Sequence, residues 1–98
     1  MLISVTDDEH GRYLVESETG SRYTLDLDKR IVRRLPTELS ALRLRRDGDH
    51  VDLVEVVRCA VGQPMLLLVD LNVPGVWLTT RESTRVVRID RLPEHSVR

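Results

Sequence analysis

The sequence has one cysteine, no phenylalanine and few aromatic residues of any kind, with aromatics making up 3% of its 98 positions. A lone cysteine excludes an internal disulfide and a zinc site built from several thiolates. Cys59 stands in the largely apolar stretch Val56–Val61, where an unpaired cysteine behaves as a small hydrophobic residue. We therefore expect Cys59 to be buried and unreactive.

Long hydrophobic runs are also absent. The longest is Met65–Val69, which fits a central strand and falls far short of the about 20 residues of a membrane-spanning helix. Near the N-terminus, Asp7, Asp8 and Glu9 stand where a signal peptide would have a basic start followed by an apolar stretch. We expect a cytoplasmic protein with no membrane partner.

Lysine is nearly missing, since Lys29 is accompanied only by arginines among the 15 basic residues. Such a bias is common in proteins from GC-rich genomes and points to a bacterial or phage source. The formal net charge of −1 hides a segregation of charge along the chain. Residues 1–28 are acidic, 29–46 strongly basic and 47–55 acidic again. Charges of opposite sign on neighbouring strands can neutralise one another; the alternative interpretation is a binding face.

The most informative segment is Gly20–Arg34. Tyr23, Leu25 and Leu27 alternate with polar residues, which is the period of a strand buried on one face. Asp28 and Lys29 interrupt this pattern, and residues 30–35 then read as a return strand. The segment predicts a β-hairpin whose apolar side contributes to the core.

Turn signals recur along the rest of the chain at the spacing of about 8–12 residues that is typical of small barrels and sandwiches. Further strands are expected at 2–6, 12–16, 42–46, 51–57, 65–71, 76–79 and 84–89. Thr37 is a candidate cap for one short helical turn over 37–41. We predict an all-β single domain over 1–98, a barrel or sandwich of about seven to nine short antiparallel strands, with 94–98 as a frayed tail.

Residues 20–33 are faintly echoed by residues 75–88. Gly20, Thr24 and Arg30 align with Gly75, Thr79 and Arg85, and two further positions match. Chance matches among residues that this chain uses often, the shared requirements of two β-hairpins, or an old duplication would each produce this echo.

No catalytic, nucleotide or cofactor motif is present, so we expect no catalytic residue, no cofactor and no bound metal. Asp7, Asp8, Glu9 and His10 form the densest set of oxygen and nitrogen ligands. Adjacent loop residues seldom converge on one ion, and the other histidines are scattered. A metal-dependent or small-molecule enzyme centred on Asp7, Asp8 and His10 is therefore the third hypothesis.

The arginines offer a stronger candidate site. The basic stretch and its surroundings define a candidate basic face of Arg33, Arg34, Arg43, Arg45 and Arg46. Guanidinium groups match phosphate and carboxylate oxygens in bidentate geometry, so a nucleic-acid-binding β-barrel is the second hypothesis. The acidic total and the scarcity of aromatic stacking residues count against it.

Trp77, the single tryptophan, follows a Pro-Gly turn. Its expected place is the core or its edge, although tryptophan is also enriched at interface hot spots. A β-domain with open edges often pairs with a copy of itself. The leading hypothesis is a non-catalytic interaction module acting through protein–protein contacts, with a homodimer as one form and Trp77 as the candidate interface residue.

Overall fold

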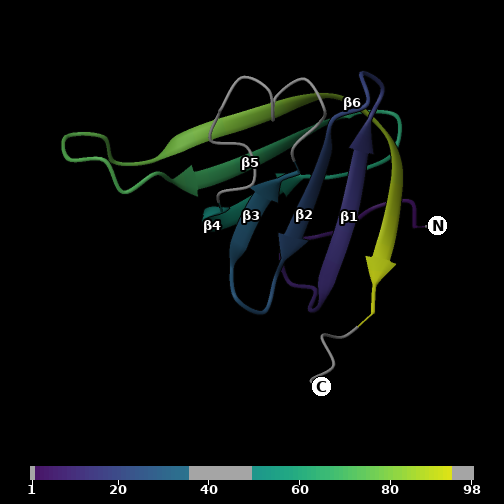
Figure 1. The fold of residues 1–98 in the computed structure, drawn as a ribbon, viewed down its shortest axis with the longest axis horizontal. Coiled ribbons are helices and arrows are strands. Elements are labelled where there is room, and N and C mark those ends of the chain that lie inside the picture. Colours follow the sequence, from purple (N-terminus) through teal and green to yellow (C-terminus); the bar gives the residue numbers. More distant parts are fainter. Residues whose placement is uncertain (1, 36–49, 94–98) are drawn as a thin grey trace.

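A computed structural model describes residues 2–35 and 50–93. These residues form six antiparallel strands: β1 (Arg12–Ser17), β2 (Arg22–Asp26), β3 (Ile31–Arg34), β4 (His50–Arg58), β5 (Pro64–Asp70) and β6 (Thr79–Leu92). The strands follow one another in chain order around a closed barrel, and β6 returns to pair with β1 (Figure 1). The predicted all-β class is confirmed, and the barrel form of it is the one observed.

Closure depends on the length of β6, which has 14 residues. Its first half pairs with β5, from Thr79 opposite Val69 to Arg85 opposite Pro64. Its second half pairs with β1, ending at Leu92 opposite Arg12. One long strand thus joins both sides of the barrel, with a register irregularity in each of its ladders. Such irregularities bend a strand and increase its twist.

The core consists of aliphatic side chains that alternate along the strands. Val15, Val69 and Ile89 have no exposed surface. The expected burial is confirmed for Leu25 in β2 and for Leu27, which directly follows β2, while Tyr23 is half-buried and packs against the core. Cys59 is also buried, as expected.

The N-terminal segment is not the expected strand over residues 2–6. It forms one isolated bridge, from Ser4 to Ala60, and is not one of the strands of the barrel. Val5 is buried, whereas Ile3 is 78% exposed. Leu2 N donates to Ile89 O at 2.8 Å, so the segment contacts β6 as well as residues 59–61. Val5 N donates to Cys59 O at 2.9 Å.

The expected hairpin of strands 76–79 and 84–89 is wrong, since Thr79–Leu92 is one continuous strand. The polar run Arg81–Thr84 resembles a turn, but these residues lie on a stretch of β6 with a largely exposed face. Residues 2–6 do not form a strand either. The described ranges therefore contain six strands, against the seven to nine expected. The helical turn over 37–41, the strand over 42–46 and the tail over 94–98 lie outside the described residues.

The two echoed segments have different structures. Residues 20–33 comprise β2, a turn and part of β3, whereas residues 75–88 comprise a loop end and most of β6. Arg30 lies in a tight turn with φ of 56°, while its counterpart Arg85 is within a strand. Shared hairpin requirements therefore do not account for the echo.

Candidate functional site

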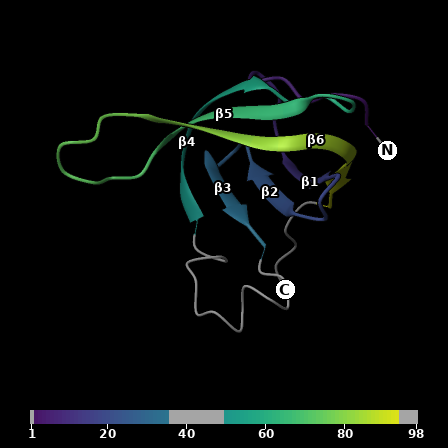
Figure 2. The same cartoon turned by 90° about the horizontal axis from the view of Figure 1, so that it is seen from above.

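The loop between β5 and β6 reaches away from the barrel, as the two perpendicular views both show (Figures 1 and 2). We call residues 71–78 the β5–β6 tip. Its sequence is rich in apolar residues, and Val73, Val76 and Trp77 are 45%, 45% and 85% exposed. Trp77 was expected in the core or at its edge, but the structure places it at the surface.

The base of the tip is fixed by Asn72. Asp52 and Asp70 lie directly opposite each other on β4 and β5, an arrangement of like charges that is unfavourable by itself. Asn72 lies between them: its backbone N donates to Asp70 Oδ1 at 2.8 Å, and its Nδ2 donates to Asp52 Oδ2 at 3.0 Å. The residue has a positive φ of 58°, which asparagine tolerates better than most residues.

The end of the tip is a tight turn of Val73, Pro74, Gly75 and Val76. Val76 N donates to Val73 O at 3.0 Å, and Gly75 has a φ of 84°. These are the marks of a type II turn, in which proline sets the first central φ and glycine accepts the second. The apolar side chains of the tip are thus presented on an ordered backbone, which lowers the entropy cost of binding.

A cavity of about 390 Å³ opens beside the tip. Its volume lies within the range of about 300–1,000 Å³ that is usual for ligand pockets. The lining is contributed by β2 to β6 and by the tip: Tyr23, Val32, Arg34, Val51, Met65, Leu67, Leu71, Val73, Arg81, Glu82 and Ser83. Leu71 and Val73 belong to both features, so the tip and the cavity form one continuous surface.

The polar groups of the cavity lie largely on β6. Ser83 Oγ accepts a hydrogen bond from Met65 N at 3.0 Å and donates to Thr84 O at 2.6 Å. Glu82 and Arg58 form a loose ion pair at 3.6 Å, with 59% and 40% of their side chains exposed. The cavity therefore combines apolar walls with a carboxylate that can accept a hydrogen bond from an occupant.

Two arginines of the candidate basic face lie within the described residues. Arg33 is opposite Thr24 and His50 in the neighbouring strands and faces outward. Arg34, the next residue, lines the cavity, and its Nη2 donates to Ser21 Oγ at 3.3 Å. A ligand on the outer surface of β3 would meet Arg33, while one in the cavity would meet Arg34. Arg43, Arg45 and Arg46 lie outside the described residues.

On the outer surface, opposite charges alternate across the strands. Glu16 on β1 is opposite Arg22 on β2 and Arg88 on β6. Arg88 Nε also bonds Asp90 Oδ2 at 2.6 Å. Charges of opposite sign therefore lie on neighbouring strands at these positions, while part of the basic stretch 29–46 lies outside the described residues.

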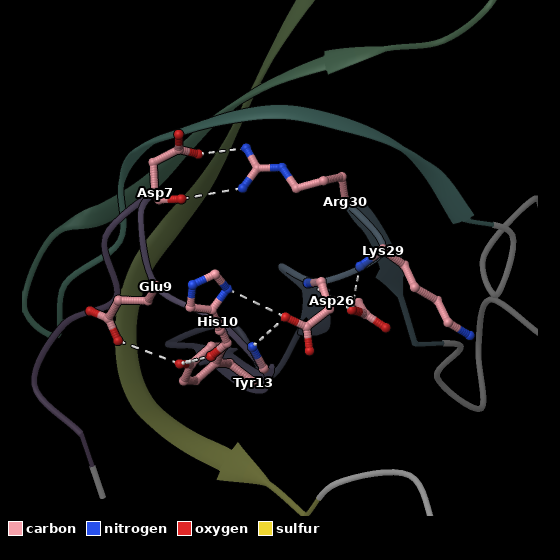
Figure 3. A network of polar contacts seen from close by, with 9 residues as sticks. Asp7, Glu9, His10, Tyr13, Asp26, Lys29 and Arg30 are labelled. Atoms are coloured by element: carbon pink, nitrogen blue, oxygen red, sulfur yellow. Dashed lines mark hydrogen bonds and ion pairs between the residues drawn. The ribbon is translucent and has the colours of Figure 1, made fainter.

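The acidic side chains near the N-terminus form hydrogen bonds with other residues of the fold. Asp7 Oδ1 accepts hydrogen bonds from Val56 N and from Arg30 Nη2, each at 2.7 Å, and Figure 3 shows the Arg30 guanidinium facing Asp7. The hydrogen bond from Val56, followed by that from Arg30, holds the pKa of the Asp7 carboxyl below its ordinary value. Arg30 Nη2 also donates to Val54 O at 2.8 Å.

The other acidic groups of this cluster bond nearby residues. Asp8 Oδ1 accepts from Thr6 Oγ1 at 2.6 Å, and Glu9 Oε2 accepts from Thr6 N at 3.1 Å. His10 Nδ1 lies 3.6 Å from Asp28 Oδ1. Across residues 2–35 and 50–93, no group of three His, Cys, Asp or Glu side chains is placed to hold a metal ion. The geometry gives the cluster a structural role.

Comparison with known proteins provides no relative: no family model, no curated protein and no solved structure matches this chain. In the portion of the chain that the structure describes, no helix has the length and apolar character needed to span a membrane. The tip is the feature that the sequence interpretation missed. The sequence feature that could have indicated it is the apolar stretch Val73–Leu78 around a Pro-Gly turn. An ordinary surface turn would be polar.

Proposed function

We propose that this protein is an interaction module that binds another protein through the β5–β6 tip. The observation that supports this most directly is the 85% exposure of Trp77. Tryptophan is enriched among interface hot spots because its large apolar surface gains much from burial. Val73 and Val76 extend the apolar surface around it, and contiguous exposed apolar surface rimmed by polar residues is typical of interaction sites.

The charges near the tip favour a protein over a membrane surface. Asp52 and Asp70 lie at its base, and residues 71–78 contain no basic residue. Protein segments that insert into anionic bilayers usually have arginine or lysine beside their apolar residues. Carboxylates in that position would be repelled instead.

Nucleic-acid binding receives less support. Arg33 and Arg34 lie on different faces of β3, and Arg22 and Arg88 flank Glu16 across the sheet. A phosphate backbone needs several cations on one surface. A gel shift at about 50 mM salt, where phosphate contacts are strong, tests this second hypothesis.

The proposed function is tested by introducing a photo-crosslinking amino acid at position 77 and irradiating cells of the source organism that express the chain. The matched control places the same group at position 3, since Ile3 is exposed to a similar extent, 78%, but lies in the N-terminal segment. Protein adducts, including adducts of the chain with itself, should form from position 77 in clear excess over position 3. Equal yields from the two positions would refute binding through the tip.

A further inference from the structure

The β5–β6 tip and the adjoining cavity are complementary to each other. The tip carries an exposed indole, and the cavity has an apolar lining in which Val51, Leu71 and Val73 keep accessible surface. A buried indole also needs an acceptor for its N–H. Glu82 lines the cavity with its carboxylate partly exposed, and so supplies one.

From this complementarity we infer that the partner is a second copy of this chain, with Trp77 of each copy inserted into the cavity of the other. The inference rests on the proposed function and identifies the protein that the tip binds. In a two-fold dimer the same patch is used on both copies, so that residue i meets j and j meets i. Tip and cavity satisfy this condition because they share Leu71 and Val73 and lie side by side.

The area available is close to what a specific interface needs. A buried aromatic side chain removes about 150–250 Å² from water, and the cavity wall that covers it loses a similar area. Two such contacts remove about 600–1,000 Å² from water, and Val73 and Val76 at their margins add to this, so that the total approaches the roughly 1,000 Å² that a specific interface needs. The ordered turn at Pro74 and Gly75 limits the entropy that the tip loses on insertion.

This mode of pairing differs from the one that the sequence suggested. Pairing through an open strand edge requires unpaired backbone groups. Each of the six described strands has a neighbour on both sides of the closed barrel, and open edges are limited to parts of strands, such as residues 79–84 of β6, which pair with β5 alone. Exchange of side chains between tip and cavity needs no strand edge.

Trp77 is the only tryptophan in the sequence, so its fluorescence reports the proposed contact directly. Sedimentation equilibrium and emission spectra are measured from micromolar to about 1 mM chain, a range that detects even weak association. The molecular mass should rise toward that of a dimer as the emission shifts to the blue and acrylamide quenching weakens. Trp77→Ala should raise the dissociation constant at least about 30-fold, as loss of a hot spot does, while Ile3→Ala should leave it unchanged.

The placement of Trp77 in the partner's cavity is tested by disulfide formation between two single variants that both retain the tryptophan. Val76→Cys is on the tip and Arg81→Cys is at the cavity. A mixture of the two should give a mixed disulfide in excess over a mixture of Ile3→Cys with Arg81→Cys. Cys59 is buried in the core and should not take part.

Three results would overturn the inference. They are a chain that stays monomeric over the whole range, a dimer that persists in Trp77→Ala, or cross-linking in the tip mixture no greater than in the Ile3 mixture. If the chain is monomeric but position 77 still forms adducts with a different protein, the proposed function stands and this inference fails. A blue shift with phosphatidylglycerol vesicles in a monomeric chain, without excess protein adducts at position 77, would overturn both.

Discussion

Arg30 and Asp7 together provide hydrogen bonds to the edge of β4 beyond the point where β3 begins. β3 pairs with β4 from Ile31, opposite Asp52, to Arg33, opposite His50. The residues of β4 that follow Asp52 lie beyond the start of this ladder, and there the two side chains provide hydrogen bonds. Asp7 accepts from Val56 N, and Arg30 donates to Val54 O. Their mutual contact of 2.7 Å links the N-terminal segment to the β2–β3 turn. Backbone groups that a short strand leaves unpaired are satisfied by charged side chains.

Replacement of Asp7 by alanine should therefore destabilise the protein. It removes the acceptor of Val56 N and the partner of Arg30. Hydrogen bonds to charged groups contribute about 1.5–3 kcal/mol when well shielded, and partial exposure of both side chains reduces this to about 1–2 kcal/mol. Urea unfolding measures the change. The control is Asp8→Ala, because Asp8 is exposed and bonds Thr6, and its effect should stay within about 0.5 kcal/mol.

The contribution of Asp7 should depend on pH. Its pKa in the folded chain is lowered, first by the Val56 hydrogen bond and then by Arg30, from an ordinary value of 3.8. A lowered pKa means that ionised Asp7 favours the folded state, so its contribution is complete above pH 3.8 and is lost as the pH falls through the folded-state pKa. The difference in free energy of unfolding between wild type and Asp7→Ala should thus narrow in acid. If the difference in free energy of unfolding between wild type and Asp7→Ala stayed constant from neutral pH to about pH 2, below the ordinary aspartate range, ionisation of Asp7 would not be the source of its contribution.

Cys59 should resist thiol reagents in the native state. Burial raises its pKa to about 11, with Glu9 adding to the effect, so the thiol remains protonated at neutral pH and is shielded from solvent. The reactive species is the thiolate. Ellman's reagent should leave native protein unmodified for as long as it stays folded and should modify one thiol per chain in guanidinium chloride. Rapid reaction of the native chain would show that the site is open.

Replacement of Trp77 by alanine should change the free energy of unfolding far less than replacement of Ile89 by alanine. Trp77 is 85% exposed and Ile89 is fully buried. Trp77→Ala should change the free energy of unfolding by no more than about 0.5 kcal/mol, whereas Ile89→Ala should cost about 2–5 kcal/mol because it leaves a cavity in the core. The unfolding midpoints of the two variants in urea, at a chain concentration where wild type is monomeric, check this. A large loss in Trp77→Ala would place the tryptophan in the core and weaken the proposed function.

Several parts of the fold could be predicted because their causes are local. The alternation of Leu25 and Leu27 with polar residues requires a strand with one buried face, whatever surrounds it. The apolar environment of Cys59 predicted its burial for the same reason. The expected hairpin at 76–89 failed because the polar residues of β6 look like a turn until the β5 ladder places them in a strand.

The candidate site was harder to predict from the sequence than the fold. Trp77 was singled out as a candidate interface residue, but its hydrophobicity predicted a place in the core or at its edge, and the structure exposes it. The cavity brings together residues from β2 to β6, so no local pattern could indicate it. The roles of Asp7 and Arg30 depend on where β3 stops pairing with β4, which is a property of the assembled sheet.

The sequence by itself determined the all-β class, the aliphatic core of the barrel and the absence of an internal disulfide, because residue spacing and residue chemistry are enough to establish these. Tertiary structure decided the closure of the barrel by β6, the exposure of Trp77 and the use of Asp7 as a backbone acceptor. Each of these depends on which distant segments lie side by side. Hydrophobic spacing specifies which face of a strand is buried, but only the packed barrel determines which apolar residues remain outside it.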